Sequence, residues 1–311
     1  MEMRQVLASE LEKLMDKDER IVLIDADLSK PNGVAKLREK FPDRAFEVGI
    51  AEQNMASVAA GMSSYGFIPF ITTFTPFATR RICDQIAISM LYAKQNVKII
   101  GTDPGISAEF NGGTHMSVED IGVIRSIPGI VIFEPVDNVQ LKKLLPQIVK
   151  YHGTVYIRMF RKTIDTIFSE DSEFDLFKAT KIQDGTDLSI FCSGLMVQET
   201  MRANDILKQE NINAEIVNIH TIKPIDREAI IESAKKTGAV LTVENHNVIG
   251  GLKSAVCEVL MEEYPAPLKA IGIEDVFGQV GKLPYLKEAY NMRAEDIVSA
   301  AKEVIAMKNK K

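Results

Sequence analysis

The chain has 311 residues, of which 46% are hydrophobic and 26% charged, as in soluble globular proteins with room for two domains. A formal net charge of −6 gives no basic face for nucleic acid, and no apolar run is long enough to cross a membrane. The acidic, amphipathic N-terminus does not resemble a signal peptide, and the three cysteines have no ligand-like spacing. We therefore expect a cytoplasmic protein without zinc or disulfides.

Strands and helices alternate along the first half of the chain. An apolar-striped helix at the N-terminus precedes strand candidates at 21–28, 45–49, 67–73, 97–101, 130–134 and 154–158, with helices at 53–64, 80–94 and 138–150. This alternation predicts a mainly parallel sheet with helices on both faces, in which sites form at the carboxyl ends of strands.

The sequence becomes charged and turn-rich between Arg161 and Gly185, as inter-domain linkers do. A second series then begins, with strands at 187–192, 214–219, 239–243 and 267–273 and helices at 196–208, 226–236 and 252–263. The fold prediction is α/β with two doubly wound domains, 1–163 and 186–311, joined by a linker at 164–185.

The stretch Phe46 to Arg80 combines one carboxylate with two aromatic rings. Glu52 stands at the expected start of a helix, and Phe74 and Phe77 follow the next strand. A carboxylate at a helix start is usually a favourable dipole contact, and phenylalanines three residues apart usually pack in a core. Brought together in a cleft, however, the three side chains would suit a flat heteroaromatic ligand with ring nitrogens.

Two segments of this stretch, GIAEQNM and TTFTPFATR, resemble the pyrimidine-binding domain of transketolases, thiamine-diphosphate enzymes that transfer two-carbon ketol units. Later segments, TIKPID, TVENHNVIGGL and IGIEDVFGQVG, resemble the transketolase C-terminal domain, for which we expect a dimerisation and support role. The resemblance implies that Glu52 hydrogen-bonds N1′ of the cofactor's aminopyrimidine and that Phe74 and Phe77 hold its ring. It also implies cofactor contacts from Ile50 and Arg80.

The run IDADLS places acidic residues at the carboxyl end of the first predicted strand. A polar turn that caps the next segment would account for them equally well. The resemblance implies that Asp27 and Leu28 touch the cofactor between its two rings.

The long loop at 101–120 contains His115, which matches a histidine that contacts the donor substrate and the reacting centre in transketolases. An imidazole can give or take a proton near neutral pH, as sugar hydroxyl chemistry requires. Asp103 and Asn111 stand where many transketolases have His and Asp residues that contact donor hydroxyls. Whether the ketose is one of the common sugars of the pentose phosphate pathway therefore stays open.

Arginines are the candidates for binding the phosphate of a sugar phosphate, because the guanidinium fork matches that anion. Arg158 closes a predicted strand at a position where the family has such an arginine, Arg4 matches a second one, and Arg161 is a nearby alternative. His220 and His246, in the second domain, are expected to make structural polar contacts.

The sequence lacks the Gly-Asp-Gly motif with which the family begins its metal site for the cofactor's diphosphate. We therefore expect no metal on this chain. An N-terminal transketolase subunit would supply the diphosphate site and its Mg²⁺ or Ca²⁺, in an α2β2 heterotetramer with a homodimer contact. The implied reaction, in which Glu52 activates the aminopyrimidine, moves a ketol unit from a ketose (phosphate) to an aldose (phosphate).

Three other functions fit parts of the pattern. The β subunit of a 2-oxo-acid dehydrogenase E1 component shares the architecture but lacks the GIAEQNM and GGTH segments. An enzyme similar to deoxyxylulose-phosphate synthase would use pyruvate as its donor and is normally one longer chain. A non-catalytic scaffold subunit is the third, against which the intact Glu52, Phe74, Phe77 and His115 argue.

Overall fold

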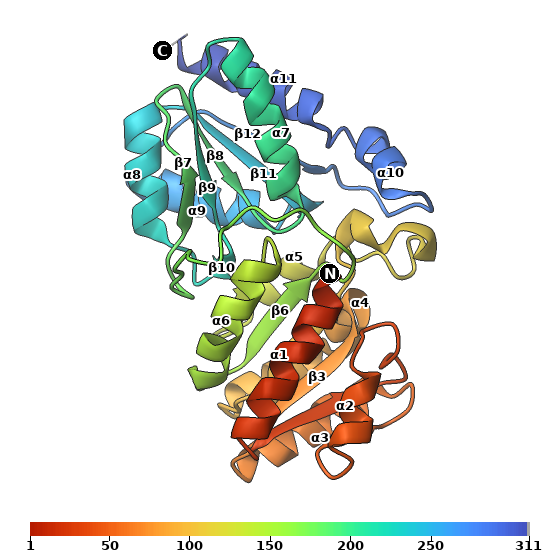
Figure 1. Ribbon diagram of the computed structural model, residues 1–311. Coiled ribbons are helices and arrows are strands. Elements are labelled where there is room, and N and C mark those ends of the chain that lie inside the picture. Colours follow the sequence, from red (N-terminus) through yellow and green to blue (C-terminus); the bar gives the residue numbers. More distant parts are fainter. Residues whose placement is uncertain (310–311) are drawn as a thin grey trace.

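Two α/β lobes lie end to end in the computed structural model, which describes residues 1–309 (Figure 1). Positions 310 and 311, the last two of the expected second domain, lie outside the described residues. Within residues 1–309, no helix combines the length and apolar composition that crossing a bilayer requires.

The first lobe is built on a seven-stranded sheet in the order β10-β5-β6-β4-β3-β1-β2, and every pairing except that of β10 with β5 is parallel. Its strands are nearly continuous apolar runs, as expected where both faces of a parallel sheet are covered. The strands from this part of the chain are β1 (Ile21–Asp25), β2 (Ala45–Glu47), β3 (Ile68–Phe74), β4 (Lys98–Thr102), β5 (Val131–Phe133) and β6 (Val155–Met159).

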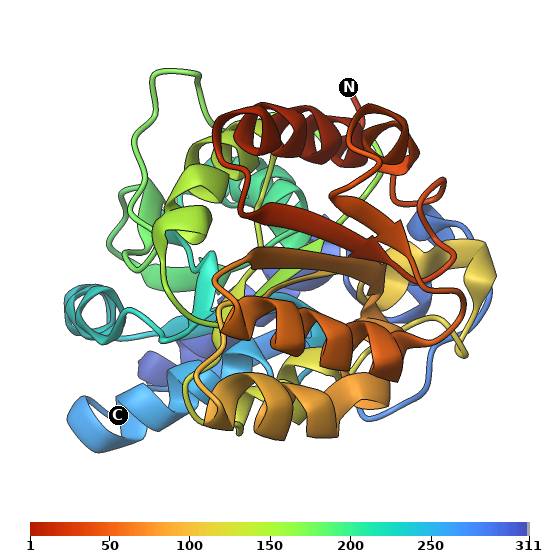
Figure 2. The ribbon, with the colours of Figure 1, turned by 90° about the horizontal axis from the view of Figure 1, so that it is seen from below.

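Helices cover both faces of this sheet, which Figure 2 shows edge-on between two helical layers. One hydrophobic core lies under α1, α2 and α6, and another lies under α3, η2 and α5. The helices are α1 (Met3–Lys17), α2 (Ala35–Lys40), α3 (Glu52–Ser64), α4 (Thr75–Ala78), the 3-10 helices η1 (Arg80–Ile82) and η3 (Gly105–Asn111), the π-helix η2 (Gln85–Tyr92), α5 (Asp120–Arg125) and α6 (Asn138–Lys150).

The second lobe has a five-stranded sheet in the order β12-β11-β8-β9-β7, parallel except for β7. Helices α7 and α11 pack on one face, and α8 and α9 pack on the other. The elements from this part of the chain, of which β10 joins the first sheet, are β7 (Thr180–Gln183), β8 (Leu188–Cys192), α7 (Met196–Gln209), β9 (Ala214–Asn218), β10 (Thr221–Lys223), α8 (Arg227–Thr237), β11 (Val240–Asn247), α9 (Leu252–Glu263), β12 (Leu268–Ile273), α10 (Leu283–Ala289) and α11 (Ala294–Lys308).

Three details differ from the expectations. The end of the expected linker forms β7, an antiparallel edge strand of the second sheet. Strand β10 reaches back from the second half of the chain and pairs with β5 of the first sheet. The predicted helix at 80–94 is divided into η1 and η2, although its apolar face, Ile82, Ile86 and Met90, is buried as expected.

Among the contacts that hold the remaining linker against the first lobe is one buried acid. Asp137 caps α6 by accepting from the Gln140 N–H at 2.9 Å. Its second carboxylate oxygen accepts the N–H groups of Ile167 and Phe168, both at 2.8 Å. The connection between the lobes is therefore a packed segment rather than a free tether.

Candidate active site

The candidate residues of the first lobe converge because the strands before them are parallel neighbours. In parallel α/β sheets, the segments that follow adjacent strands meet at one edge of the sheet, where ligands bind. Strands β6, β4, β3, β1 and β2 are consecutive in the sheet and all run the same way. Glu52, Phe74, Asp103, Asp27 and Arg161 each lie at or shortly after the end of one of these strands.

Glu52 is the first residue of α3 and is only 4% exposed. The buried positions Met55, Ala56 and Ala59 fix this helix against the sheet, so its first turn is held at the strand edge. The carboxylate accepts a hydrogen bond from Nη1 of Arg81 at 2.7 Å. A buried carboxylate with one half-exposed cationic partner therefore points at this edge.

Three rings lie together at the same edge, and Arg81 links one of them to that carboxylate. Phe74 precedes α4 and Phe77 lies within it, with their ring centroids 6.4 Å apart. The His115 ring meets both edge-on, at 5.3 Å from Phe77 and 6.1 Å from Phe74. The Arg81 guanidinium carbon lies 3.8 Å above the centre of the Phe77 ring. We call Glu52, Phe74, Phe77, Arg81 and His115 the ring cluster; the structure brings together the four that we predicted and adds Arg81.

His115 reaches the cluster from the segment that follows β4. This segment winds through η3 and has positive φ angles at Asp103 (54°) and Glu109 (48°). Such conformations are costly for residues with a side chain and persist where the surroundings impose them, often at functional sites. The Nδ1 atom of His115 lies 2.8 Å from the Thr114 hydroxyl, which fixes one side of the half-buried ring.

The segments after β1 and β2 are tied together by two carboxyl groups. Glu47 accepts the N–H groups of Asp27 at 2.7 Å and Gly49 at 2.8 Å, and Asp25 accepts that of Leu28 at 2.8 Å. Burial raises the pKa of Asp25 to about 8, helped by the adjacent Glu47, so Asp25 is the protonated member of the pair near neutral pH. The exposed Asp27 and the half-buried Leu28 are thus held at the edge by a carboxyl–carboxylate contact.

Basic groups stand on the other side of the ring cluster. The Arg161 guanidinium carbon lies 5.1 Å from the centre of the Phe74 ring. Arg161 and Arg4 both donate to the carbonyl of Pro31, at 3.3 and 2.8 Å. Arg161 therefore lies next to the Phe74 ring, and Arg4, from the other end of the first lobe's sequence, meets it at the Pro31 carbonyl.

Asp103 lies beneath Arg161 and is 1% exposed. Its Oδ2 is 2.5 Å from Nε of Arg161, but the groups are not aligned for a hydrogen bond, and both Asp103 oxygens and this Nε lack a hydrogen-bond partner among residues 1–309. Burial raises the pKa of Asp103 to about 6, against the pull of Arg161 and Lys162. The predicted contact with sugar hydroxyls would need these unpaired atoms to become accessible, and it stays a prediction.

Arg158 does not reach the site, which corrects the expectation that it binds a substrate phosphate. Its side chain is fully buried, and it donates to Asp120 at 2.7 and 3.1 Å, to Glu134, and to the carbonyl of Asn245 at 2.7 Å. A guanidinium with these partners has no accessible donor for a ligand. Of the candidate arginines, Arg161 lies beside the Phe74 ring, and Arg4 meets Arg161 at the Pro31 carbonyl while it also pairs with the part-exposed Glu2 at 2.7 Å.

The remaining candidates line the approach to the cluster or lie away from it. Ile50 is 75% exposed just before Glu52, and Asn111 is exposed at the end of η3. Arg80 turns away from Glu52 and pairs with Glu119 at 2.6 Å. His220 and His246 are buried, and each lies within hydrogen-bond distance of a main-chain carbonyl, at 3.0 and 2.7 Å.

The ring cluster fits one end of a planar nitrogen heterocycle. The Arg81 guanidinium is itself a flat group with N–H donors, and it is bonded to Glu52 and stacked on Phe77. It shows that a planar donor can satisfy the carboxylate and the ring face at once. An aminopyrimidine offers a ring of similar thickness with nitrogen atoms at its edge, so Glu52, Phe77, Phe74 and His115 are the residues that would hold it.

The two lobes match two protein-family models. Residues 1–165 match the transketolase pyrimidine-binding domain, and residues 178–297 match the transketolase C-terminal domain. These ranges cover most of the chain and keep the order in which the two lobes follow one another.

Relatives and a solved structure match over almost the whole chain. A 6-deoxy-6-sulfo-D-fructose transketolase subunit of Clostridium sp. strain MSTE9 is 50% identical, with 94% of this chain and 91% of that protein aligned. One of the subunits of an apulose-4-phosphate transketolase of Phocaeicola vulgatus is 33% identical, with 97% of both aligned. A solved structure described as a split-gene transketolase in an inactive β4 tetramer superposes with a TM-score of 0.92 at 40% identity, covering 99% of both chains.

Proposed function

The chain belongs to the transketolase family, and from that premise we propose that it is the subunit of a two-chain transketolase that holds the aminopyrimidine of thiamine diphosphate. The observation that carries the proposal is the buried Glu52 carboxylate, which Arg81 links to the face of Phe77, with the His115 ring edge-on to Phe77 at 5.3 Å. Thiamine diphosphate, when bound, supplies the carbon centre that accepts and donates the two-carbon unit.

Each residue of the ring cluster except Arg81 has a role in this reaction that its geometry supports. Glu52 holds or shares a proton at N1′ of the aminopyrimidine, from the first turn of α3. Phe74 and Phe77 set the ring plane, and the exposed Ile50 and the half-buried Leu28 add apolar contact at the same edge. His115 moves a proton to or from a substrate hydroxyl near the reacting centre.

A companion chain completes the site in this proposal. The relatives named as subunits align over 91% and 97% of their own lengths, so this chain corresponds to whole subunits of multi-chain enzymes. We propose that the companion is an N-terminal transketolase subunit that carries the diphosphate site and its Mg²⁺ or Ca²⁺, in an α2β2 assembly. The description of the solved neighbour as inactive in its β4 form is consistent with such a need for a companion.

The donor is a ketose that carries an anion at the end remote from its carbonyl. Arg161 and Arg4 meet beside Phe74, where they can pair with a sulfonate or a phosphate. The relative at 50% identity acts on a sulfosugar, so 6-deoxy-6-sulfo-D-fructose is the first candidate, ahead of a common pentose phosphate. A donor screen with this sugar, D-fructose 6-phosphate and pyruvate separates the sulfosugar, sugar-phosphate and deoxyxylulose-phosphate-synthase-like reactions.

The test of the proposal is Glu52→Gln in the two-subunit complex. Loss of the shared proton should lower kcat by roughly 100-fold or more, while circular dichroism and subunit association stay unchanged. Glu215→Gln is the matched control, because Glu215 is also a buried carboxylate paired with a half-buried cation, Lys236, at 2.5 Å. Near-normal turnover in Glu52→Gln would rule out the proposed role of Glu52.

A further inference from the structure

Arg81 takes part in the ring cluster, although neither its position in the sequence nor the proposed reaction assigns it a role. Its Nη1 donates to Glu52 at 2.7 Å, and its guanidinium carbon lies 3.8 Å above the Phe77 ring centre. Its neighbour Arg80, which we had expected at the cofactor, pairs with Glu119 instead. Arg80 and Arg81 are adjacent in the sequence, and the direction of the Arg81 side chain is what brings its guanidinium to Glu52 and Phe77.

The partners of Arg81 are complementary to it in charge and shape. A buried carboxylate without a counter-charge is strongly unfavourable, and Glu52 is 4% exposed. A guanidinium is planar and always charged, so it can neutralise the acid at its edge while its face stacks on an aromatic ring. The Arg81 side chain thus supplies both the counter-charge for Glu52 and the flat group that stacks on Phe77.

We propose that Arg81 is a resident side-chain ligand of this site, and that its guanidinium occupies the place which the aminopyrimidine must take. A ring stacked on Phe77 and bonded to Glu52 cannot share that space with a guanidinium 3.8 Å above the same ring. The side chain of Arg81 is 42% exposed, so it can leave toward solvent without unpacking a core. The identity of the incoming ring rests on the proposed function, whereas the occupancy by Arg81 does not.

A resident ligand lowers the apparent affinity for the incoming one, because its contacts must first be broken. It also leaves the Glu52 carboxylate paired with a cation while no other ligand is present. The free subunit would then be stable with Arg81 in place. Only a ligand that both bonds to Glu52 and stacks on Phe77 would displace Arg81. Other cations would bond to Glu52 without stacking on Phe77, and apolar molecules would stack on Phe77 without bonding to Glu52.

The occupancy is tested on the free full-length chain, without any companion. Urea unfolding of Arg81→Ala, Glu52→Gln and the double variant forms a double-mutant cycle, in which the loss from Arg81→Ala should shrink when Glu52 is already neutral. Ethylguanidinium at millimolar concentration should raise the Tm of Arg81→Ala by about 2 °C and leave the double variant unchanged. If the two substitutions had additive effects on stability and ethylguanidinium did not raise the Tm of Arg81→Ala, the proposed occupancy of the site by Arg81 would be overturned.

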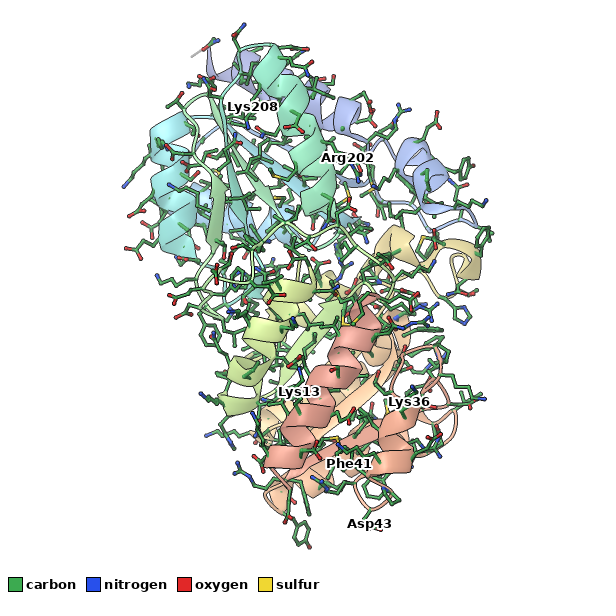
Figure 3. All side chains as sticks on the ribbon, in the orientation of Figure 1. Lys13, Lys36, Phe41, Asp43, Arg202 and Lys208 are labelled. Atoms are coloured by element: carbon green, nitrogen blue, oxygen red, sulfur yellow. The ribbon has the colours of Figure 1, made fainter. Side chains whose placement is uncertain are left out.

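Arg44→Ala is the matched control for these measurements. Arg44 also lies over an aromatic ring of the first lobe, with its guanidinium carbon 4.8 Å from the centre of Phe41. Phe41 lies at the end of the first lobe remote from the second lobe (Figure 3). Ethylguanidinium that stabilised Arg44→Ala to the same extent would show a general effect and would contradict a specific site.

The competition is tested on the complex with the companion subunit, by calorimetric titration with thiamine diphosphate and magnesium. Arg81→Ala should bind the cofactor about fivefold more tightly than the wild type, since a half-exposed ion pair with a stacked ring is modest in strength. Arg81→Lys keeps the charge but loses the flat face, so its affinity should fall between the two. Equal or weaker binding by Arg81→Ala would overturn the competition, whereas absence of binding by the wild type would instead overturn the proposed function.

Discussion

Two arginines three residues apart differ completely in their surroundings. Arg158 ends inside the protein among Asp120, Glu134 and a main-chain carbonyl, while Arg161 is half-buried beside the Phe74 ring. Strand β6 accounts for the difference, because Arg158 lies within it and Arg161 follows its end. Both arginines are anion-binding candidates on sequence grounds, and they differ in how deeply their side chains are buried in the structure.

The same substitution at both arginines should therefore have opposite consequences. Arg158→Lys leaves buried carboxylates short of donors and should cost about 2–4 kcal/mol of the free energy of unfolding, with the donor KM unchanged. Arg161→Lys keeps a charge over Asp103 but loses the fork, so the KM for an anionic donor should rise about tenfold with little change in stability. Urea unfolding and steady-state kinetics check the pair. A KM effect at Arg158 without destabilisation would contradict this assignment.

The Asp25–Glu47 pair predicts a pH dependence of stability. The pKa of Asp25 is raised to about 8 in the folded chain, from an ordinary value of 3.8, so between these values the folded chain binds a proton that the unfolded chain does not. Stability must then fall as pH rises across this window, by up to about 1.4 kcal/mol per pH unit from this group. Although burial opposes it, the contacts with Asp25 and with the N–H groups of Asp27 and Gly49 lower the pKa of Glu47 from its ordinary value of 4.5.

Asp25→Asn should remove this pH dependence of stability, because an asparagine side chain does not titrate. The local contacts should remain, since an amide can still donate toward Glu47 and accept from the Leu28 N–H. Urea unfolding at pH 5 and pH 8 should show the wild type losing more stability than the variant over this interval. The variant should be at least as stable as the wild type at pH 8. Equal slopes in the two proteins would contradict a shared proton at this pair.

The site was predictable to the extent that its residues sit on regular elements. Glu52 at a helix start and Phe74 after a buried strand followed from apolar periodicity, and parallel strand order brought them together. Arg81 and Glu47 were not predictable in this way. Their roles depend on side-chain direction and on loop contacts across the sheet edge, which spacing along the chain does not encode.

At the scale of elements, the second lobe fixes the loop that carries His115. Asn245, at the end of β11, donates from Nδ2 to the Pro104 carbonyl at 2.8 Å and accepts the Ile106 N–H at 2.9 Å. Between these two residues Gly105 has a φ of 53°, and a Cβ there would lie 2.2 Å from the Asn245 oxygen. The yellow segment that contains η3 lies between the two lobes in Figure 1. Asn245 is thus a positioning residue for the loop.

Asn245→Asp should disturb this loop, because a carboxylate oxygen would then face the Pro104 carbonyl. The KM for the donor should rise about tenfold, as expected for loss of a buried hydrogen bond that becomes repulsive. Hydrogen exchange of the Ile106 amide should accelerate.

Asn218→Asp is the control for this prediction. Asn218 is equally buried, and it donates to the Cys192 carbonyl at 3.2 Å and accepts from Gln140 at 2.9 Å. It should lose comparable stability without a change in KM. A KM change of similar size in both variants would show that the loop effect is not specific.

The elements themselves were mostly predictable, and the failures have local causes. Buried parallel strands such as β3 are long apolar runs, which periodicity detects well. Strand β7 was assigned to the linker because its sequence, TKIQ, is half-exposed and short. Strand β10 has only three residues and forms by pairing with β5 of the first lobe. The local sequence pattern does not indicate such a long-range pairing.

At the scale of the whole molecule, the lobes are joined by a buried polar network rather than by a flexible hinge. Arg158 of the first lobe binds the carbonyl of Asn245 in the second, and Ser193 of the second lobe donates to Glu134 of the first at 2.7 Å. Side chains fill the waist between the lobes (Figure 3). The second lobe therefore acts as a fixed support for the edge at which the ring cluster lies.

The most direct test of this account is the position of the cofactor ring in a crystal structure of the two-subunit complex with thiamine diphosphate and magnesium. We predict a Glu52 carboxylate oxygen about 2.7–3.0 Å from N1′ of the aminopyrimidine. The ring should lie against Phe77, and the diphosphate should be bound by the companion chain. An aminopyrimidine bound elsewhere, with Glu52 still paired to Arg81, would contradict the account.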